Sequence, residues 1–238
     1  VKLVLFDIDG TLVHTGGAGI KAFAKAFATE FGIPNGTEKM KFAGRTDVGL
    51  VREFFRQNDI EPDAEHFRRF FESYVFWLDH ILAQSETAAC PGIWELIRDL
   101  QALPDAPTLG LLTGNIRLGA EIKLRHFDLW QEFVTGGFAD DHEDRDQIAH
   151  AAHRRGSKLY GRPLRGEEVV VIGDTPLDVS CARAIGANAV AVATGWHPLD
   201  ELTACEPDHI FAAFPTSPRP RRVGDGWLGI SRAAVGAG

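Results

Sequence analysis

The sequence has few of the features that mark several large classes of protein. Its 238 residues include only three cysteines, Cys90, Cys181 and Cys205. An odd number at such wide spacing predicts reduced thiols, not a disulfide framework or a zinc site. No apolar run approaches the ~20 residues that span a bilayer. Aspartates interrupt the first apolar run, so it does not fit the core of a secretion signal. We therefore expect a soluble, cytoplasmic protein.

Positive charge is also scarce. Lysine and arginine number 25 against 33 aspartates and glutamates, a net charge of -8. Nucleic-acid-binding proteins usually carry a basic face, and the five scattered tryptophans form no array on which bases could stack. We expect neither nucleic acid nor a membrane as a partner. An anionic small molecule remains compatible, because local fields guide substrates. Monomer and homodimer both stay open.

Short apolar runs recur along the chain, and each ends in small or polar residues. They cover residues 1–6, 109–112, 169–172 and 189–192. Continuous short runs of this kind predict parallel strands that are covered on both faces. Segments with helical spacing of apolar residues lie between them, at 94–100, 118–127, 148–153 and 179–185. The pattern predicts an α/β fold with a doubly wound parallel sheet.

The first two runs are about 100 residues apart, whereas a simple crossover needs only ~12. Amphipathic helices with many phenylalanines are predicted there, at 20–31, 47–58 and 64–82. We therefore predict an inserted all-helical subdomain at residues 14–88, with residues 1–13 and 89–214 forming the α/β core. Residues 215–238, rich in Pro, Arg, Gly and Ser, are predicted to be disordered.

Aspartates follow two of the predicted strands. Asp7 and Asp9 end the first run, and Asp174 and Asp178 follow the third. Residues i and i+2 of a strand point the same way, so Asp7 and Asp9 repel each other unless a cation lies between them. Mg²⁺ prefers such carboxylates together with water and phosphate oxygens. Each aspartate alone could be a helix cap or turn residue. All four, with Thr113 after another strand, favour a metal and phosphate site.

Three motifs occur in a fixed order: DIDGTL, LLTGN and VVVIGDTPLDV. They resemble the motifs of the haloacid dehalogenase superfamily of phosphohydrolases. The helical insertion resembles the cap of its phosphoglycolate phosphatase and β-phosphoglucomutase branch. The resemblance covers residues 1 to about 214. It implies a Rossmann-like core with a helical cap, and Mg²⁺-dependent cleavage of phosphate monoesters of small metabolites, such as phosphoglycolate or sugar phosphates.

The resemblance also implies roles for the aspartates. Asp7 would be the nucleophile that forms an aspartyl-phosphate. Asp9 would be the general acid that protonates the leaving oxygen and then the base that activates water. Mg²⁺ would be held by the Asp7 carboxylate, the Asp9 backbone carbonyl and Asp174. Asp178 would be either a further ligand or an anchor for the others.

Thr113 and the backbone N–H groups of Gly114 and Asn115 resemble the groups that bind phosphoryl oxygens. The superfamily generally places a lysine ahead of the third motif. Arg145 stands at the matching place in this sequence, and its guanidinium can bind phosphate through two hydrogen bonds. Lys158 is the alternative. Arg145 is favoured because the segment around Lys158 is typical of a solvated helix end and loop.

The segment FAGRTDVGLVREF, at residues 42–54, predicts a turn and a helix start capped by Thr46 or Asp47. The resemblance implies that this loop faces the active site, where Arg45 would bind a carboxylate or phosphate of the leaving group. A surface arginine is the alternative. Gly16 and Gly17 are suited to a hinge for the cap, and a flexible connector without a mechanistic role is the alternative.

Two other functions stay open. A phosphosugar mutase of the same superfamily would return the phosphate to its substrate. A catalytically silent relative would serve as a binding module. The intact set of Asp7, Asp9, Thr113 and Asp174 argues against that second alternative.

Overall fold

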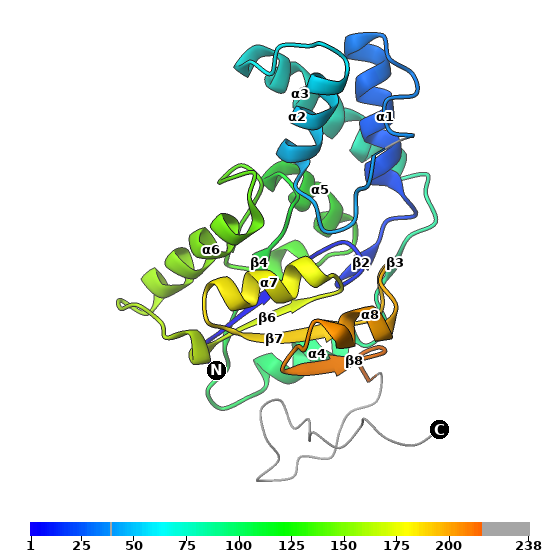
Figure 1. Cartoon of the computed structure of the whole chain (residues 1–238). Coiled ribbons are helices and arrows are strands. Elements are labelled where there is room, and N and C mark those ends of the chain that lie inside the picture. The colour runs from blue at the N-terminus through cyan, green and yellow to red at the C-terminus, as the bar shows by residue number, and fades with distance from the viewer. Residues whose placement is uncertain (39, 216–238) are drawn as a thin grey trace.

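The computed structural model describes residues 1–38 and 40–215. At its centre lies a six-stranded sheet in the order β5-β4-β1-β6-β7-β8, with every neighbouring pair parallel (Figure 1). The strands are β1 (Leu3–Phe6), β4 (Thr108–Leu112), β5 (Thr135–Gly137), β6 (Val169–Gly173), β7 (Asn188–Val192) and β8 (His209–Phe211). The strand order reverses at β1, which lies between β4 and β6. Sheets of this kind bind ligands at such a reversal, beyond the carboxyl ends of the strands.

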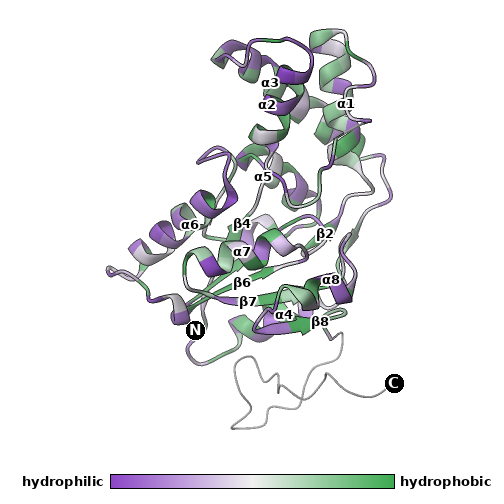
Figure 2. Cartoon of the chain, in the orientation of Figure 1, coloured by the Kyte–Doolittle hydropathy of each residue, from purple (hydrophilic) through white to green (hydrophobic). Residues whose placement is uncertain are grey.

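The sheet has an apolar core on each face. Alternate residues of a strand point to opposite faces. Val4 and Phe6 accordingly pack into the cluster that also contains residues of α4 (Ile93–Gln101) and α5 (Arg117–His126). Leu3 and Leu5 pack on the other face against α6 (Arg145–Leu159), α7 (Pro176–Ala184) and α8 (Leu199–Ala204). In Figure 2, β6 is hydrophobic along its length, whereas much of α6 is hydrophilic. The predicted doubly wound sheet is confirmed.

Three helices between β1 and β4 form the cap: α1 (Ala18–Phe31), α2 (Asp47–Gln57) and α3 (Ala64–Leu82). Phenylalanines fill their shared core, where the rings of Phe27 and Phe54 stack with centroids 3.4 Å apart. Both side chains are fully buried. In Figure 1 the cap helices lie beyond the carboxyl ends of the sheet strands. The predicted all-helical insertion is present.

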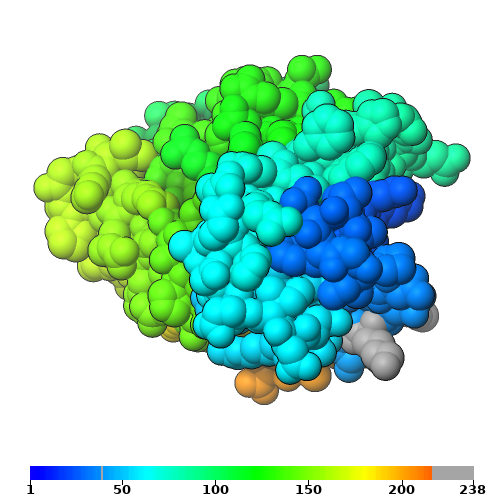
Figure 3. All heavy atoms as spheres, turned by 90° about the horizontal axis from the view of Figure 1, so that it is seen from above, coloured from blue at the N-terminus to red at the C-terminus, as the bar shows by residue number. Residues whose placement is uncertain are grey.

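The chain enters and leaves the cap through a short antiparallel pair, β2 (Val13–His14) with β3 (Ala88–Ala89). α3 also packs against α5 of the core. Figure 3 shows the cap in blue and cyan lying against green residues of the core. The division at residues 14 and 88 stays a prediction. Disorder was predicted for 215–238, of which residues 216–238 lie outside the described part.

Within residues 1–38 and 40–215, no helix combines the length and apolar character needed to cross a membrane.

Candidate active site

A pocket of about 550 Å³ lies where β1 and its neighbouring strands end beneath the cap. Core residues line its floor, and cap residues including Ile20, Phe23 and Leu50 line its roof. Among the charged and amide side chains that line it are Asp7, Asp9, Asn115, Lys123, Arg145 and Asp174. Residues separated by more than 160 positions in the chain thus meet in one cavity.

Asp7 follows β1 directly and is only 5% exposed. Its Oδ1 lies 3.4 Å from Nη2 of Arg145. Burial and the neighbouring charge of Asp178 raise the pKa of Asp7 to about 7, against the opposing charge of Arg145. A buried carboxylate in this position retains little hydration, so it depends on the charges that surround it.

Asp174 follows β6 and is completely buried. Its Oδ1 accepts a hydrogen bond from Thr11 Oγ1 at 3.0 Å, but its Oδ2 has no hydrogen-bond partner among the described residues. Burial, followed by the charges of Asp7 and Asp178, raises the pKa of Asp174 to about 9. A buried oxygen without a partner is costly, so this oxygen is suited to a bound cation.

Two glycines make room for the Asp174 carboxylate. A Cβ on Gly10 would lie 2.5 Å from Asp174 Oδ2, and a Cβ on Gly195 would overlap the same atom. Gly10 also has a φ of +89°, which residues with a side chain rarely adopt. The backbone therefore closes around the Asp174 oxygen that has no partner among the described residues.

Oxygens of Asp7, Asp174 and Asp178 lie within 4.8 Å of one another. Three buried carboxylates so close together repel one another unless positive charge neutralises them. The donor set consists only of oxygen, which suits a hard divalent cation. Together with the unpartnered Oδ2 of Asp174, this cluster fits a divalent metal.

Asp178 differs from the other two, because both of its oxygens already accept hydrogen bonds. Oδ2 accepts from the Thr175 N–H at 3.0 Å and from its hydroxyl at 2.6 Å. Oδ1 accepts from Nη2 of Arg145. Thr175 and Asp178 form the capping box that begins α7. This arrangement matches the anchoring alternative for Asp178 better than direct ligation.

Arg145 is the first residue of α6, which Asp144 caps, and is only 8% exposed. Its guanidinium contacts Asp7 and Asp178, and it donates to the Gly44 carbonyl of the cap at 3.0 Å. Burial opposes its charge, but the charges of Asp178 and Asp7 prevail and raise the pKa of Arg145. Lys158, the alternative, lies exposed in the last turn of α6. Only Arg145 of the two lies among the carboxylates.

The loop after β4 carries Thr113, Gly114 and Asn115. Thr113 is fully buried, and its hydroxyl oxygen accepts from the Asn115 N–H at 3.2 Å and from Asn115 Nδ2 at 3.1 Å. Gly114 and Asn115 line the pocket. A Cβ on Gly114 would overlap the carbonyl oxygen of Arg45. Glycine is therefore required here because the cap loop crosses this point.

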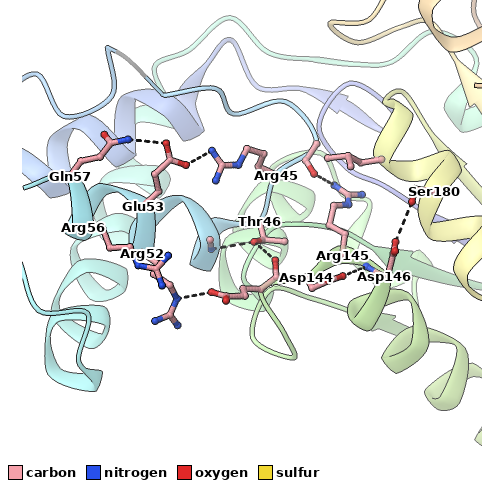
Figure 4. Close-up of a pocket in the computed structure, with 14 residues that line it drawn as sticks. Arg45, Thr46, Arg52, Glu53, Arg56, Gln57, Asp144, Arg145, Asp146 and Ser180 are labelled. Atoms are coloured by element: carbon pink, nitrogen blue, oxygen red, sulfur yellow. Dashed lines mark hydrogen bonds and ion pairs between the residues drawn. The ribbon is translucent and has the colours of Figure 1, made fainter. Parts of the chain in front are cut away.

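Arg45 lies at the edge of the pocket, where its guanidinium pairs with Glu53 at 2.5 Å. It also lines a neighbouring groove of about 690 Å³ between α2 and the start of α6. Figure 4 shows the cap and core linked across this groove, where Thr46 Oγ1 donates to the Glu143 carbonyl at 2.8 Å and Arg52 pairs with the Glu143 carboxylate at 2.6 Å. The contact of Arg45 with a leaving group stays a prediction.

Sequence reasoning missed two charged residues of the site. Lys123 of α5 is 4% exposed, and its Nζ lies 2.6 Å from Asp9 Oδ2. Asp47 begins α2, and its Oδ2 accepts from the Ile116 N–H at 2.8 Å. Burial raises the pKa of Asp47 to about 7, although the charge of Lys123 lowers it. For Lys123, the available signal was its place beside Leu124 in the helix predicted at 118–127.

The comparisons with known proteins cover most of the chain. The family model for haloacid dehalogenase-like hydrolases matches residues 4–192. The probable phosphatase IndB of Dickeya dadantii (strain 3937) is 27% identical over 220 residues, or 89% of this chain and 90% of that protein. Pyrophosphatase PpaX of Bacillus cereus (strain B4264) is 24% identical over 210 residues, covering 87% of this chain and 90% of its own length.

Solved structures share the fold. A predicted phosphoglycolate phosphatase from Haemophilus somnus 129pt has a TM-score of 0.69 at 20% identity, covering 90% of this chain and 94% of its own. CbbY from Rhodobacter sphaeroides, in complex with phosphate, has a TM-score of 0.69 at 19% identity, covering 90% and 95%. The family match includes β4, β6 and all of β1 except Leu3, together with Asp7, Asp9, Thr113, Arg145 and Asp174. The chain therefore belongs to the haloacid dehalogenase-like hydrolases.

Proposed function

We propose that this chain is a Mg²⁺-dependent phosphatase that cleaves phosphate monoesters of small metabolites through an aspartyl-phosphate on Asp7. The observation that carries the proposal is the buried group formed by Asp7, Asp174 and Asp178 around Arg145. A nucleophilic carboxylate, an oxygen-only metal site and a phosphate-binding cation are the parts that phosphoryl transfer needs. The names of IndB and of the phosphoglycolate phosphatase support the same reaction class.

Mg²⁺ would be held by the Asp7 carboxylate, the Asp9 backbone carbonyl and Asp174, with Asp178 as their anchor. When bound, it would supply positive charge that balances the carboxylates and the phosphate oxygens. The unpartnered Oδ2 of Asp174 supports its assignment as a ligand.

In the first step, an oxygen of Asp7 attacks phosphorus as the bond between phosphorus and the leaving oxygen breaks. Asp9 gives its proton to that leaving oxygen, so a neutral alcohol departs and the phosphoryl group remains on Asp7. Arg145 stabilises the charge on the phosphoryl oxygens. The backbone N–H groups of Gly114 and Asn115, with the Thr113 hydroxyl, would assist it.

In the second step, Asp9 accepts a proton from water as the water oxygen attacks phosphorus. The bond between phosphorus and Asp7 breaks, inorganic phosphate leaves, and both carboxyl groups return to their starting states.

The pocket suits a small substrate, because its volume is only about 550 Å³ and cap residues close it from above. Phosphoglycolate and sugar phosphates are the proposed substrate class. Arg45 would bind an anionic group of the substrate by exchanging its partner Glu53. We expect a protein without nucleic-acid or membrane partners, located in the cytoplasm, as a monomer or homodimer.

The test is a screen of phosphorylated metabolites with Mg²⁺, run on the wild type, Asp7→Asn and Asp99→Asn. Asp99 is an exposed residue of α4, so its variant is a matched control for the loss of one carboxylate. We expect phosphate release by the wild type and the control but not by Asp7→Asn. Rapid quenching and mass spectrometry should locate the phosphoryl group on the peptide that carries Asp7.

Three results would contradict the proposal. Wild-type turnover by Asp7→Asn would exclude Asp7 as the nucleophile. Isomerisation of a sugar phosphate without release of phosphate would instead identify a mutase. A wild type without activity on any compound would support the binding-module alternative.

A further inference from the structure

Lys123 is a buried lysine on the inner face of α5. Only 4% of the residue is exposed, and the neighbouring Ala120 and Leu124 belong to the apolar core. Lysine is almost never buried to this extent unless its charge is paired, because the ammonium loses its hydration. Its partners therefore indicate why it is there.

Both partners of Lys123 belong to the active site. Its Nζ lies 2.6 Å from Asp9 Oδ2 and 2.5 Å from Asn115 Oδ1. Asn115 Nδ2 donates to the same Asp9 oxygen at 2.9 Å. Two donors that also bond to each other thus fix one oxygen of Asp9.

The other oxygen of Asp9 is left for a ligand. Among the described residues, no hydrogen bond reaches Asp9 Oδ1, and the Asp9 side chain is 38% exposed and lines the pocket. A carboxyl group fixed by one oxygen cannot rotate freely. It presents its second oxygen to the cavity in a constant direction.

The surroundings of Lys123 keep its ammonium in place. Gly19 of α1 approaches it, since a Cβ there would lie 3.5 Å from Nζ. Burial raises the pKa of the nearby Asp47 of α2 to about 7, and the charge of Lys123 opposes this shift. The ammonium thus gains an ion pair with Asp9 of the core in place of the water that it loses on burial.

We propose that Lys123 is a positioning residue that holds Asp9 for proton transfer to the leaving oxygen. The inference rests on the proposed phosphatase function. Proton transfer by a positioned side chain contributes roughly 10²–10⁴-fold to a rate, and a misplacement near 1 Å removes about 10²-fold. A lysine that only stabilised the fold would not affect this step in particular.

The leaving group separates the two roles. p-Nitrophenolate departs without a proton, whereas an alkoxide needs one. We expect Lys123→Met to lower kcat/KM by about 10²-fold for an alkyl phosphate but by less than about tenfold for p-nitrophenyl phosphate. Lys25→Met, which changes an exposed lysine of α1, is the matched control and should leave both values unchanged.

A second variant covers the case in which Lys123→Met does not fold. Lys123→Ala opens a space that a small amine can enter, because Lys123 lines the pocket. Ethylammonium should restore kcat/KM for the alkyl phosphate several-fold in this variant and should not affect Lys25→Met. Circular dichroism and the Tm verify that the variants are folded.

The outcomes distinguish the inference from the function on which it rests. Equal losses for both substrates, or no loss, in an active and folded variant would overturn the role of Lys123 alone. Failure of the amine to restore activity to a folded Lys123→Ala would do the same. A wild type that hydrolyses neither compound would remove the proposed function and this inference with it.

Discussion

Asp47→Asn should stabilise the folded protein near pH 8 and have much less effect near pH 5. Asp47 is a buried carboxyl group at the start of α2, where its Oδ2 accepts a hydrogen bond from the Ile116 N–H at 2.8 Å. The Asn amide oxygen can accept the same bond. The substitution therefore removes the titrating group while it retains its size and its main contact.

The magnitude follows from the shifted pKa. Burial, opposed by the charge of Lys123, raises the pKa of Asp47 from 3.8 to about 7 in the folded state, whereas the unfolded chain retains the ordinary value. The folded state therefore binds a proton that the unfolded state has released, and the stability from this proton is lost as the pH rises through about 7. Between pH 5 and pH 8 the loss is about 3 kcal/mol, at about 1.4 kcal/mol for each pH unit below the pKa.

The assay is urea unfolding of the wild type and Asp47→Asn near both pH values, in the same chelator-containing buffer. The difference in unfolding free energy should shift by about 3 kcal/mol in favour of the variant as the pH rises. Asp99→Asn is the control, because Asp99 is an exposed residue of α4. Its difference from the wild type should stay constant. If Asp47→Asn also shows a constant difference, a raised pKa for Asp47 is refuted.

Three further predictions concern the site and the cap. Gly195→Ala would place its Cβ on Asp174 Oδ2. Calorimetry should therefore show a Mg²⁺ affinity at least about tenfold weaker than that of the wild type. An unchanged affinity would exclude Asp174 as a ligand. Arg145→Lys loses a guanidinium that bonds two carboxylates and the cap, so kcat/KM should fall about 10²-fold or more, and near-normal activity would contradict its role. Phe54→Ala removes a fully buried ring that stacks on Phe27. Urea unfolding should show that the free energy of unfolding falls by about 3–5 kcal/mol. A fall of less than about 1 kcal/mol would contradict the packing role of Phe54.

The sequence predicts the central strands well because they are apolar on both faces. The run at 189–192 differs from β7 by one residue, and the runs at 109–112 and 169–172 differ equally little from β4 and β6. β5, with the sequence TGG, gives no such signal. Side chains on its glycines would crowd Leu111 of β4 and Ile148 of α6. β5 is therefore specified by its neighbours, which the local sequence does not reveal.

Helix ends were predicted less well than helix centres. The helix predicted at 148–153 extends over Arg145–Leu159. Asp144 begins it by accepting from the Asp146 N–H at 2.8 Å. An aspartate before a charged first turn is a recognisable start signal, although apolar spacing alone misses it. The difference matters because it makes Arg145 the first residue of a helix that points into the site.

The motifs predicted which carboxylates meet, but the residues that hold them came from contacts between distant segments. The sequence did not decide whether Thr46 or Asp47 caps the N-terminus of α2. The Thr46 hydroxyl accepts from the Gly49 N–H at 3.2 Å, which leaves the Asp47 carboxylate for Ile116. Lys123 follows the same logic: its position on α5 predicts burial, but its partners depend on how α5 meets β1.

The cap and the catalytic residues share hydrogen bonds, so they cannot be understood as separate parts. Arg145 donates to Gly44 at 3.0 Å, and the Asp47 N–H donates to Gly114 at 2.7 Å. Opening of the cap would break both bonds, although Arg145 would keep its bonds to Asp7 and Asp178. Closure over a substrate would restore them. The residues proposed to bind the phosphoryl group would thus have all of their contacts when the closed cap excludes water, and exclusion of water strengthens the electrostatic interactions that phosphoryl transfer uses.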